Sequence, residues 1–326
     1  MRIRTKLTAW GCAVVAGASV LTGCGLSSSF ALPLDIEPGT LPAHALDGVH
    51  LVVGSKDFTE EIILGHIAEF ALAASGADIE DLTNIQGSNS ARNALVNGDV
   101  DLYYDYTGTG WINYLGNDKP IPDQQKQYEA MRDADAKNGM VWLPYSPLND
   151  TYAFAMNPQV TRKLKIKSIS DMVAKIKQDP SIGTFCLETE FASRNDGFPG
   201  VKKTYGFEVP AANVKNFGTG AVYAATASGS CNFGEVFTTD GRIRALNLTV
   251  LQDDKQFFPQ YNVAPVVRKE VLDAHPAIAE VFNKIAPKLN NDMMIDLAAK
   301  VDVDGADPVT VARDWLAKEG FIKLPK

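Results

Sequence analysis

Short apolar runs alternate with helical patterns along most of the chain. Residues 49–53 form an apolar run of the length of a buried strand, and the segment after it ends at the pair Ser75-Gly76. The apolar residues of that segment recur at helical spacing: Ile62, Ile63, Ile67, Phe70 and Ala71. Asp57 and Glu60 are three positions apart, as in a capping box. These residues predict a strand followed by a capped helix.

The same alternation continues through most of the chain. Further strands are predicted at 82–85, 100–104, 151–156, 182–187, 233–238 and 263–267. A helix that ends at Asn97-Gly98 lies between the first two, and the C-terminal part is predicted to be helical at 276–289, 292–301 and 308–318. Strands that alternate with helices pair into sheets with helices on both faces. The predicted fold class is therefore α/β, with mixed, mostly parallel sheets flanked by helices.

The N-terminus has the pattern of an export signal. Residues 1–23 begin with three basic side chains, and the apolar run that follows is too short for a permanent membrane anchor. The run ends in the sequence LTGC, which resembles a bacterial lipobox, so we expect Cys24 to be lipidated after cleavage of the signal. An ordinary secretory signal with a chance cysteine is the alternative. Residues 24–48 are rich in Ser and Pro, which predicts a tether.

Composition and charge restrict the class of protein. The apolar content of 45% is that of a globular chain. Residues 1–23 hold three basic and no acidic side chains, so without them the net charge of -8 becomes -11, from 28 basic and 39 acidic residues. An acidic chain without a basic run argues against nucleic acid as a partner. The residues after position 48 suffice for two domains.

Two cysteines remain in the predicted folded part, Cys186 and Cys231. In an oxidising compartment an isolated pair predicts a disulfide, and two buried free thiols are the alternative. The four histidines show no spacing typical of metal ligands. We therefore expect no metal and no cofactor.

Ligands of open α/β sheets bind at loops beyond the carboxyl ends of strands, so residues that directly follow strands are candidates. Six such motifs stand out: GSKDFTE (54–60), DLYYDYTGT (101–109), NDTYA (149–153), SRNDG (193–197), FTTDGRI (237–243) and FFPQY (257–261). Together, and in this order, they resemble the glycine betaine, choline and carnitine (quaternary ammonium, osmoprotectant) substrate-binding lipoproteins of ABC importers. The resemblance covers about residues 49–326.

The resemblance implies a two-domain type II periplasmic-binding-protein fold. The first domain would comprise residues 49–150 and 262–326, and the second residues 151–261. The chain would cross between them near Asp150 and Tyr261, which would form the hinge. A ligand would lie between the domains and be buried when they close.

The resemblance also implies a binding site with two ends. A trimethylammonium group carries charge but has no N–H to donate, so several aromatic faces are the selective way to hold it. The family's cage positions fall on Tyr106, Tyr152, Phe237 and Tyr261. The positions that bind the ligand carboxylate fall on Lys56, Thr109 and Arg194, and arginine suits planar, bidentate recognition.

Each of these residues has a structural alternative. Tyrosines near strand ends are often half-buried core residues, and Arg194 could instead pair with Glu188 or Glu190. Phe237 departs from the family, which usually has tyrosine there. It keeps an aromatic face but is the weaker cation–π partner. Choline, carnitine, proline betaine and ergothioneine therefore stay open as ligands beside glycine betaine.

The sequence thus predicts an extracytoplasmic solute-binding protein, anchored as a lipoprotein at the outer face of the cytoplasmic membrane. It would capture glycine betaine or a related compound as a monomer and deliver it to the permease of an ABC importer. The alternative from another class is an enzyme in the cleft. Its candidate groups are Asp101 with Asp105, Glu188 with Glu190, and Cys186 with His66, and none stands in a recognisable catalytic motif. We therefore do not expect an enzyme.

Overall fold

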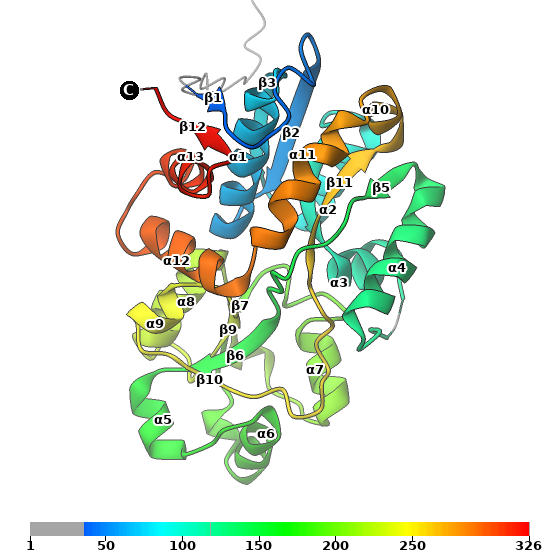
Figure 1. Ribbon diagram of the computed structural model, residues 1–326. Helices are drawn as coiled ribbons and strands as arrows, with labels where there is room; N and C mark the ends of the chain where they lie inside the picture. The colour runs from blue at the N-terminus through cyan, green and yellow to red at the C-terminus, as the bar shows by residue number, and fades with distance from the viewer. Residues whose placement is uncertain (1–35, 118, 326) are drawn as a thin grey trace, which may run out of the picture. The chain divides into compact units, whose positions relative to one another are not determined.

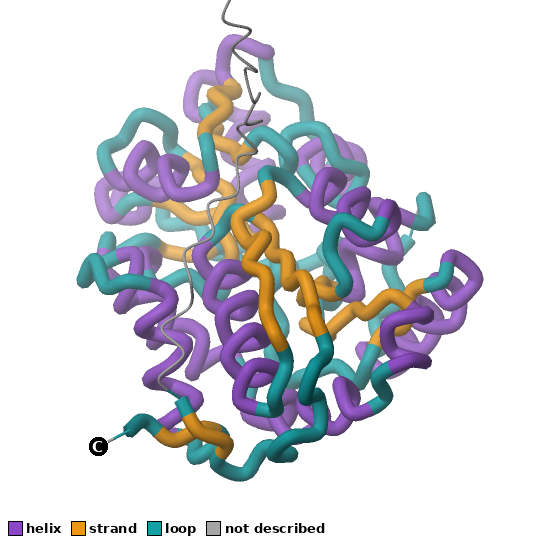
Figure 2. The backbone as a smooth tube through the Cα atoms, turned by 90° about the horizontal axis from the view of Figure 1, so that it is seen from above, coloured by secondary structure: helices purple, strands orange, loops and turns teal. Residues whose placement is uncertain are grey.

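The structure is a computed structural model that describes residues 36–117 and 119–325. The predicted signal peptide and Cys24 lie outside the described residues. In the described part, ten strands form two five-stranded sheets, and a further two-stranded ribbon joins β1 (Glu37–Pro38) to β12 (Ile322–Lys323). Helices lie on either side of the strands (Figure 2). The α/β prediction is confirmed.

The first sheet contains strands from both ends of the described chain. Its order is β3 (Asp78–Ile85), β2 (His50–Lys56), β4 (Leu102–Tyr106), β11 (Val263–Arg268) and β5 (Met140–Trp142). β2 is parallel to β3 and β4, whereas β11 is antiparallel to β4 and β5. The helices between and after these strands are α1 (Thr59–Ala74), α2 (Ser88–Asn97), α3 (Thr107–Thr109), α4 (Gln124–Asp135), α10 (Lys269–Ala274), α11 (Ala277–Ile285), α12 (Asn291–Asp302) and α13 (Pro308–Lys318).

The second sheet is built from the middle of the chain, drawn in green and yellow in Figure 1. Its order is β10 (Thr249–Val250), β6 (Tyr152–Met156), β9 (Phe233–Phe237), β7 (Phe185–Glu188) and β8 (Val214–Phe217). Its helices are α5 (Pro158–Leu164), α6 (Ile169–Gln178), α7 (Phe198–Tyr205), α8 (Thr219–Ala227) and α9 (Arg242–Ala245). Over the two sheets, four strand pairs are parallel and four antiparallel, so parallel pairs are fewer than the sequence predicted. The difference arises because β11 and β6, the first strands after each passage between the sheets, run against their neighbours.

Local signals explain the ends of two helices of the first sheet, but not the start of α1. Helix α1 buries Ile63, Ile67 and Phe70 completely and ends at Ser75 as predicted. Helix α2 ends at Gly98, whose φ of 83° suits a residue without a Cβ. The predicted capping box of α1 is wrong. Its N-cap is Phe58, without a side-chain cap, and Asp57 instead accepts a hydrogen bond from Gly87 N at 3.0 Å.

The predicted tether is shorter than the sequence suggested. Within the range 24–48, residues 36–48 pack against the folded chain: β1 pairs with β12, and Leu41 and Leu46 belong to the main hydrophobic core. The Ser- and Pro-rich composition predicted a tether because it gave no weight to these two leucines. Their burial contributes a favourable free energy that a free tether would not have. The prediction of a tether is therefore wrong for residues 36–48, and residues 24–35 lie outside the described part.

Two connections join the sheets, and they lie side by side. One leads from β5 to β6 through Asn149 and Asp150, and the other leads from β10 to β11 through Tyr261 and Asn262. Tyr261 N donates to Asn149 Oδ1 at 2.7 Å, and Asp150 N donates to Tyr261 O at 3.3 Å. An isolated β-bridge also links Asn149 to Asn262. The two connections therefore form a short hydrogen-bonded ribbon.

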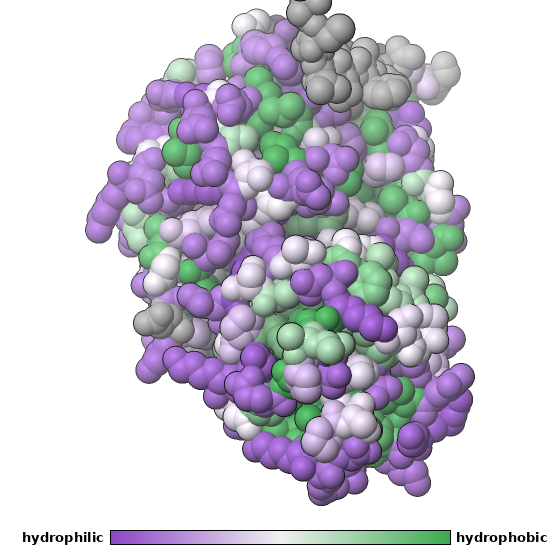
Figure 3. All heavy atoms as spheres, turned by 180° about the vertical axis from the view of Figure 1, so that it is seen from behind, coloured by the Kyte–Doolittle hydropathy of each residue, from purple (hydrophilic) through white to green (hydrophobic). Residues whose placement is uncertain are grey.

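The predicted disulfide is confirmed, because Cys186 and Cys231 are bonded, with their Cα atoms 5.6 Å apart. Cys186 lies in β7, and Cys231 lies two residues before β9, its parallel neighbour. Among the described residues, no helix is both long and apolar enough to cross a membrane. Figure 3 shows polar residues interspersed with apolar ones on the face that it draws.

Candidate functional site

All seven residues predicted to bind a ligand line a single pocket of about 600 Å³, a volume typical of small-molecule sites. They lie at or near the ends of strands of both sheets: Lys56 ends β2, Tyr106 ends β4, Thr109 lies in α3, Tyr152 begins β6 and Phe237 ends β9. Arg194 lies in the turns after β7, and Tyr261 lies in the connection to β11. The structure thus brings together residues separated by up to 205 positions in the sequence.

The aromatic residues of the pocket form a continuous cluster. The ring of Tyr152 lies 5.3 Å from that of Phe237 and 5.2 Å from that of Tyr261, with the second pair edge to face. Phe58 adds a fifth ring, 5.1 Å from Phe237 and 6.1 Å from Tyr106. Phe58 was missed in the sequence analysis although it stands in the motif after the first strand. An aromatic residue in a loop that follows a strand could have indicated a further ring of the pocket.

Hydrogen bonds fix the orientation of two of these rings. Tyr106 Oη donates to Glu60 Oε1 at 2.7 Å, and Tyr261 Oη donates to Asp196 Oδ2 at 2.8 Å. Burial and the adjacent carboxylates raise the pKa of both phenols well above the usual value for tyrosine. Both hydroxyls therefore stay protonated donors, and the faces of the rings are held in place.

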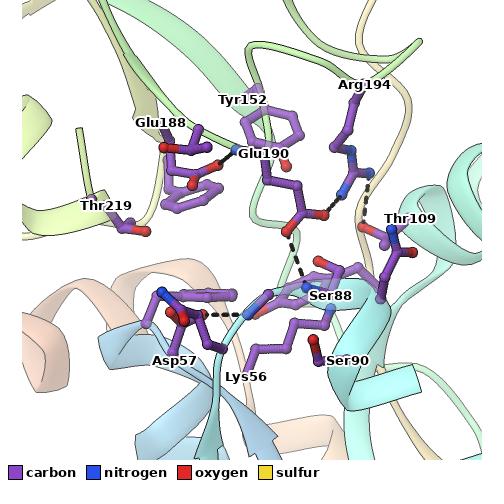
Figure 4. A pocket seen from close by; sticks show the side chains of 18 of the residues that line it. Lys56, Asp57, Ser88, Ser90, Thr109, Tyr152, Glu188, Glu190, Arg194 and Thr219 are labelled. Atoms are coloured by element: carbon purple, nitrogen blue, oxygen red, sulfur yellow. Dashed lines mark hydrogen bonds and ion pairs between the residues drawn. The ribbon is translucent and has the colours of Figure 1, made fainter. Parts of the chain in front are cut away.

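The two basic residues of the pocket are already paired with carboxylates. Lys56 Nζ lies 2.6 Å from Asp105 Oδ1 and 4.6 Å from the centre of the Tyr106 ring. Arg194 donates through Nε and Nη2 to Asp196 at 2.7 and 2.6 Å, and through Nη1 to Glu190 at 2.9 Å. The predicted alternative of pairing with Glu190 is therefore realised, while Arg194 still lines the pocket (Figure 4).

The pocket carries more acidic than basic side chains. Besides Lys56 and Arg194 its lining includes four carboxyl groups, those of Asp57, Asp150, Glu188 and Glu190. Burial raises the pKa of Asp150 to about 7. An excess of carboxylates around a cavity favours a ligand with a positively charged group.

Glu60 connects the aromatic cluster to the second sheet, a role that its prediction as a helix cap missed. Its Oε1 accepts from Tyr106, and its Oε2 accepts from Thr239 Oγ1 at 2.7 Å. Burial, and next the charge of Asp150, raise the pKa of Glu60 well above its ordinary range. Thr239 lies 179 positions away in the sequence, so only the fold reveals this contact.

Another buried carboxyl group, Glu235 of β9, predicts that stability depends on pH. It is 2% exposed, and burial, followed by the charge of Glu188, raises its pKa to about 8. Between pH 4.5 and about 8 the carboxyl group of Glu235 is protonated in the folded chain but ionised in the unfolded chain. The free energy of unfolding therefore falls as the pH rises through this range. At pH 8.5 we expect Glu235→Gln to have a free energy of unfolding higher than that of the unmodified protein by roughly 2 to 4 kcal/mol, and therefore a higher urea midpoint. At pH 5 the two midpoints should be nearly equal.

Glu208→Gln is the matched control, since the side chain of Glu208 is 81% exposed and its pairing with Lys202 is a surface one. It should leave the urea midpoint unchanged at both pH values. Equal midpoints for Glu235→Gln and the unmodified protein at pH 8.5 would contradict the raised pKa of Glu235.

The groups considered for an enzyme do not assemble into a catalytic arrangement. Cys186 is in the disulfide and cannot act as a nucleophile, so its proposed pairing with His66 is wrong. Asp101 pairs with Arg268 at 3.2 Å, away from the pocket, whereas Asp105 pairs with Lys56. Glu188 and Glu190 line the pocket, but Glu188 Oε2 accepts from the backbone N–H of Glu190 and Phe191 and so shapes the turn.

One group of the described residues has potential metal ligands close together. His66 and Glu69 of α1 and Asp81 of β3 have ligand atoms within 4.8 Å of one another. His66 and Glu69 are already hydrogen bonded, Nδ1 to Oε2 at 2.6 Å. The group does not line the pocket. The expectation of no metal stays a prediction.

Comparisons with known proteins identify the family. The family described as "Substrate binding domain of ABC-type glycine betaine transport system" matches residues 49–318. A glycine-betaine-binding protein of Pseudomonas aeruginosa is 37% identical, over 83% of this chain and 88% of that protein. An ergothioneine transport permease/ergothioneine binding protein of Helicobacter pylori is 33% identical over 86% of this chain, which spans half of that longer protein.

A solved structure supports the same assignment. A protein described as a glycine betaine/carnitine/choline ABC transporter superposes with a TM-score of 0.67 at 28% identity, over 83% of this chain and 99% of that one. The fold is therefore the two-domain α/β fold of periplasmic binding proteins. The chain belongs to the family of substrate binding domains of ABC-type glycine betaine transport systems and is a substrate-binding protein of an ABC importer.

Proposed function

We propose that this protein binds glycine betaine, or a closely related trimethylammonium compound, in the pocket between the two sheets and delivers it to the importer's permease. The observation that carries the proposal is that Tyr106, Tyr152, Phe237 and Tyr261 line the same pocket as Lys56 and Arg194. A cluster of aromatic faces beside two cations matches the two ends of a betaine. The relatives whose descriptions name betaine, carnitine, choline and ergothioneine support this ligand class.

The aromatic cluster would hold the trimethylammonium head. Each desolvated cation–π contact contributes on the order of 0.5 to 2 kcal/mol, and several such contacts around one cation exclude ions that need hydrogen-bond acceptors. Phe58 supplies an additional face next to Phe237. It thereby compensates in part for the weaker phenylalanine at a position where the family usually has tyrosine.

The carboxylate end would lie near Lys56, Thr109 and Arg194. Lys56 uses one of its three N–H groups for Asp105, and Thr109 Oγ1 lies 3.4 Å from Arg194 Nη2. A ligand carboxylate can therefore gain donors from Lys56 without breaking the pair with Asp105. Choline, carnitine, proline betaine and ergothioneine remain the alternative ligands, since they share the quaternary head.

The site would close by rotation of two domains about the paired connections. We assign residues 49–150 and 262–326 to the first domain, together with residues 36–48 that pack against it, and residues 151–261 to the second. Contacts of one ligand with both domains favour the closed arrangement. We further infer that the protein acts as a monomer outside the cytoplasmic membrane, anchored through Cys24, and that it is not an enzyme.

Titration calorimetry of the purified protein with glycine betaine, choline, carnitine, ergothioneine and lysine tests the proposal. We expect the trimethylammonium compounds to bind one to one and lysine not to bind. Absence of heat with every quaternary compound would contradict the proposed ligand class. Chemical conversion of a bound compound, followed by mass spectrometry of the ligand, would favour the enzyme instead.

A further inference from the structure

The side chain of Glu190 joins the two halves of the pocket. Its Oε1 accepts from Arg194 Nη1 at 2.9 Å on the side of the second sheet, and its Oε2 accepts from the backbone N–H of Ser88 at 3.0 Å (Figure 4). Ser88 is the first residue of helix α2, which is ten residues long. The N–H groups of a first helical turn have no partner within the helix and carry partial positive charge. The carboxylate of Glu190 thus lies between two groups that favour negative charge, the guanidinium of Arg194 and the N-terminus of α2.

The donors that hold Glu190 are the ones a ligand carboxylate would use. Of the five N–H groups of Arg194, those on Nε and Nη2 are directed at Asp196 and Thr109, so Nη1 is the nitrogen left to face the pocket. Glu190 bonds to that nitrogen. Burial would raise the pKa of Glu190, but Arg194, the Ser88 N–H and Lys56 outweigh burial and hold this pKa below its usual value. Glu190 is therefore an ionised carboxylate at the end of the pocket assigned to an anion.

Arg194 does not need Glu190 for its position. Asp196 binds the guanidinium through two oxygens, and Asp196 is in turn fixed by Tyr261 Oη at 2.8 Å. Glu190, in contrast, can move: its side chain is 26% exposed, whereas those of Arg194 and Asp196 are 3% and 2% exposed. Its backbone stays in place because Glu188 Oε2 accepts from the N–H groups of Glu190 and Phe191. The side chain can therefore leave without disturbing the turn.

We propose that Glu190 is an internal competitor for the ligand's carboxylate, and that it sets how strongly the pocket prefers betaines to quaternary ammonium compounds without a carboxylate. This inference rests on the proposed function. Two carboxylates on the same donors repel each other, so a betaine binds fully only when Glu190 gives up Arg194 Nη1 and Ser88 N. A ligand such as choline leaves Glu190 in place and gains from its negative charge. Glu190 thus weakens betaine binding and strengthens choline binding.

Glu190→Gln tests this competition, because glutamine keeps the size of the side chain and removes its charge. We expect the Kd for glycine betaine to fall by about tenfold and the Kd for choline to rise several-fold, since charge-assisted hydrogen bonds are about twice as strong as neutral ones. Calorimetry at fixed ionic strength measures both constants. Glu190→Ala should likewise lower the Kd for glycine betaine and raise the Kd for choline. Glu208→Gln, which removes one exposed carboxylate away from the pocket, is the control for net charge.

The outcomes separate the two proposals. Weaker binding of glycine betaine by Glu190→Gln would show that Glu190 positions Arg194 and would overturn the competition. Unchanged constants for both ligands would overturn it as well. If the unmodified protein bound none of the quaternary compounds, the proposed function itself would fail, and this inference with it. Opposite shifts for the two ligands, absent in Glu208→Gln, would support the competition.

Discussion

Replacing Tyr152 by alanine should lower the affinity for every trimethylammonium ligand by about 30-fold or more. Its ring contacts two other rings of the pocket, those of Phe237 and Tyr261, so its loss removes one aromatic face and loosens two others. One desolvated cation–π contact of about 2 kcal/mol already accounts for a factor of this size. Calorimetry with glycine betaine, choline and carnitine would measure the three losses in parallel.

Tyr152→Phe is the matched control, since it keeps the aromatic face and removes the hydroxyl alone. Its affinities should stay within a few-fold of those of the unmodified protein. A loss in Tyr152→Ala that affected carboxylate ligands and spared choline would show that Tyr152 acts through Arg194, whose Cζ lies 5.7 Å from the ring centre. The assignment of Tyr152 to the cage would then be wrong.

Removing the disulfide with the double substitution Cys186→Ala and Cys231→Ala should lower the free energy of unfolding by about 2 to 4 kcal/mol. The bond joins residues 45 positions apart, and the enclosed segment includes β8 and α8. Opening a loop of this length enlarges the unfolded ensemble, which is the main source of the loss. Alanine suits both sites because the cysteines pack in an apolar cluster with Val222. Urea unfolding followed by circular dichroism would measure the change.

A reducing agent provides an independent check on the same bond. The unmodified protein should approach the urea midpoint of the double variant when it unfolds under reducing conditions. The double variant itself should not respond to reduction. An unchanged midpoint in the variant would contradict a stabilising role of this disulfide.

Elements with strong local signals could be predicted from the sequence. Helix α13 was predicted at 308–318 and is observed at Pro308–Lys318. Its start is specified locally, by Pro308 in the first turn and by Asp307, whose side chain accepts from Thr310 N at 3.0 Å. The strand at the edge of the first sheet was harder to recognise. β3 begins at Asp78, four residues before the prediction, because its first half carries acidic residues that suit an exposed edge.

The sequence could predict which residues line the pocket. It could not predict which residues in and around the pocket contact one another. The motifs identified seven of the lining residues because these residues lie at or beside the ends of strands. They gave no indication that Glu60 would bond to Thr239, or that Glu190 would reach Ser88 across 102 positions. Such contacts depend on how the two sheets meet, which no local pattern encodes. The packing of Leu41 and Leu46 escaped prediction for the same reason.

The ribbon formed by the two connections would limit how the pocket opens in the proposed movement of the domains. Two chain segments that are hydrogen bonded to each other can bend together, but they cannot slide or twist independently without breaking the bonds that join Tyr261 to Asn149 and Asp150. The movement of the sheets should therefore have one main degree of freedom. Tyr261 belongs both to this ribbon and to the pocket wall, so its ring would lie on the axis of that movement. In the proposed closing movement, a pivot that also contacts the ligand would make the strength of ligand binding depend directly on the opening angle.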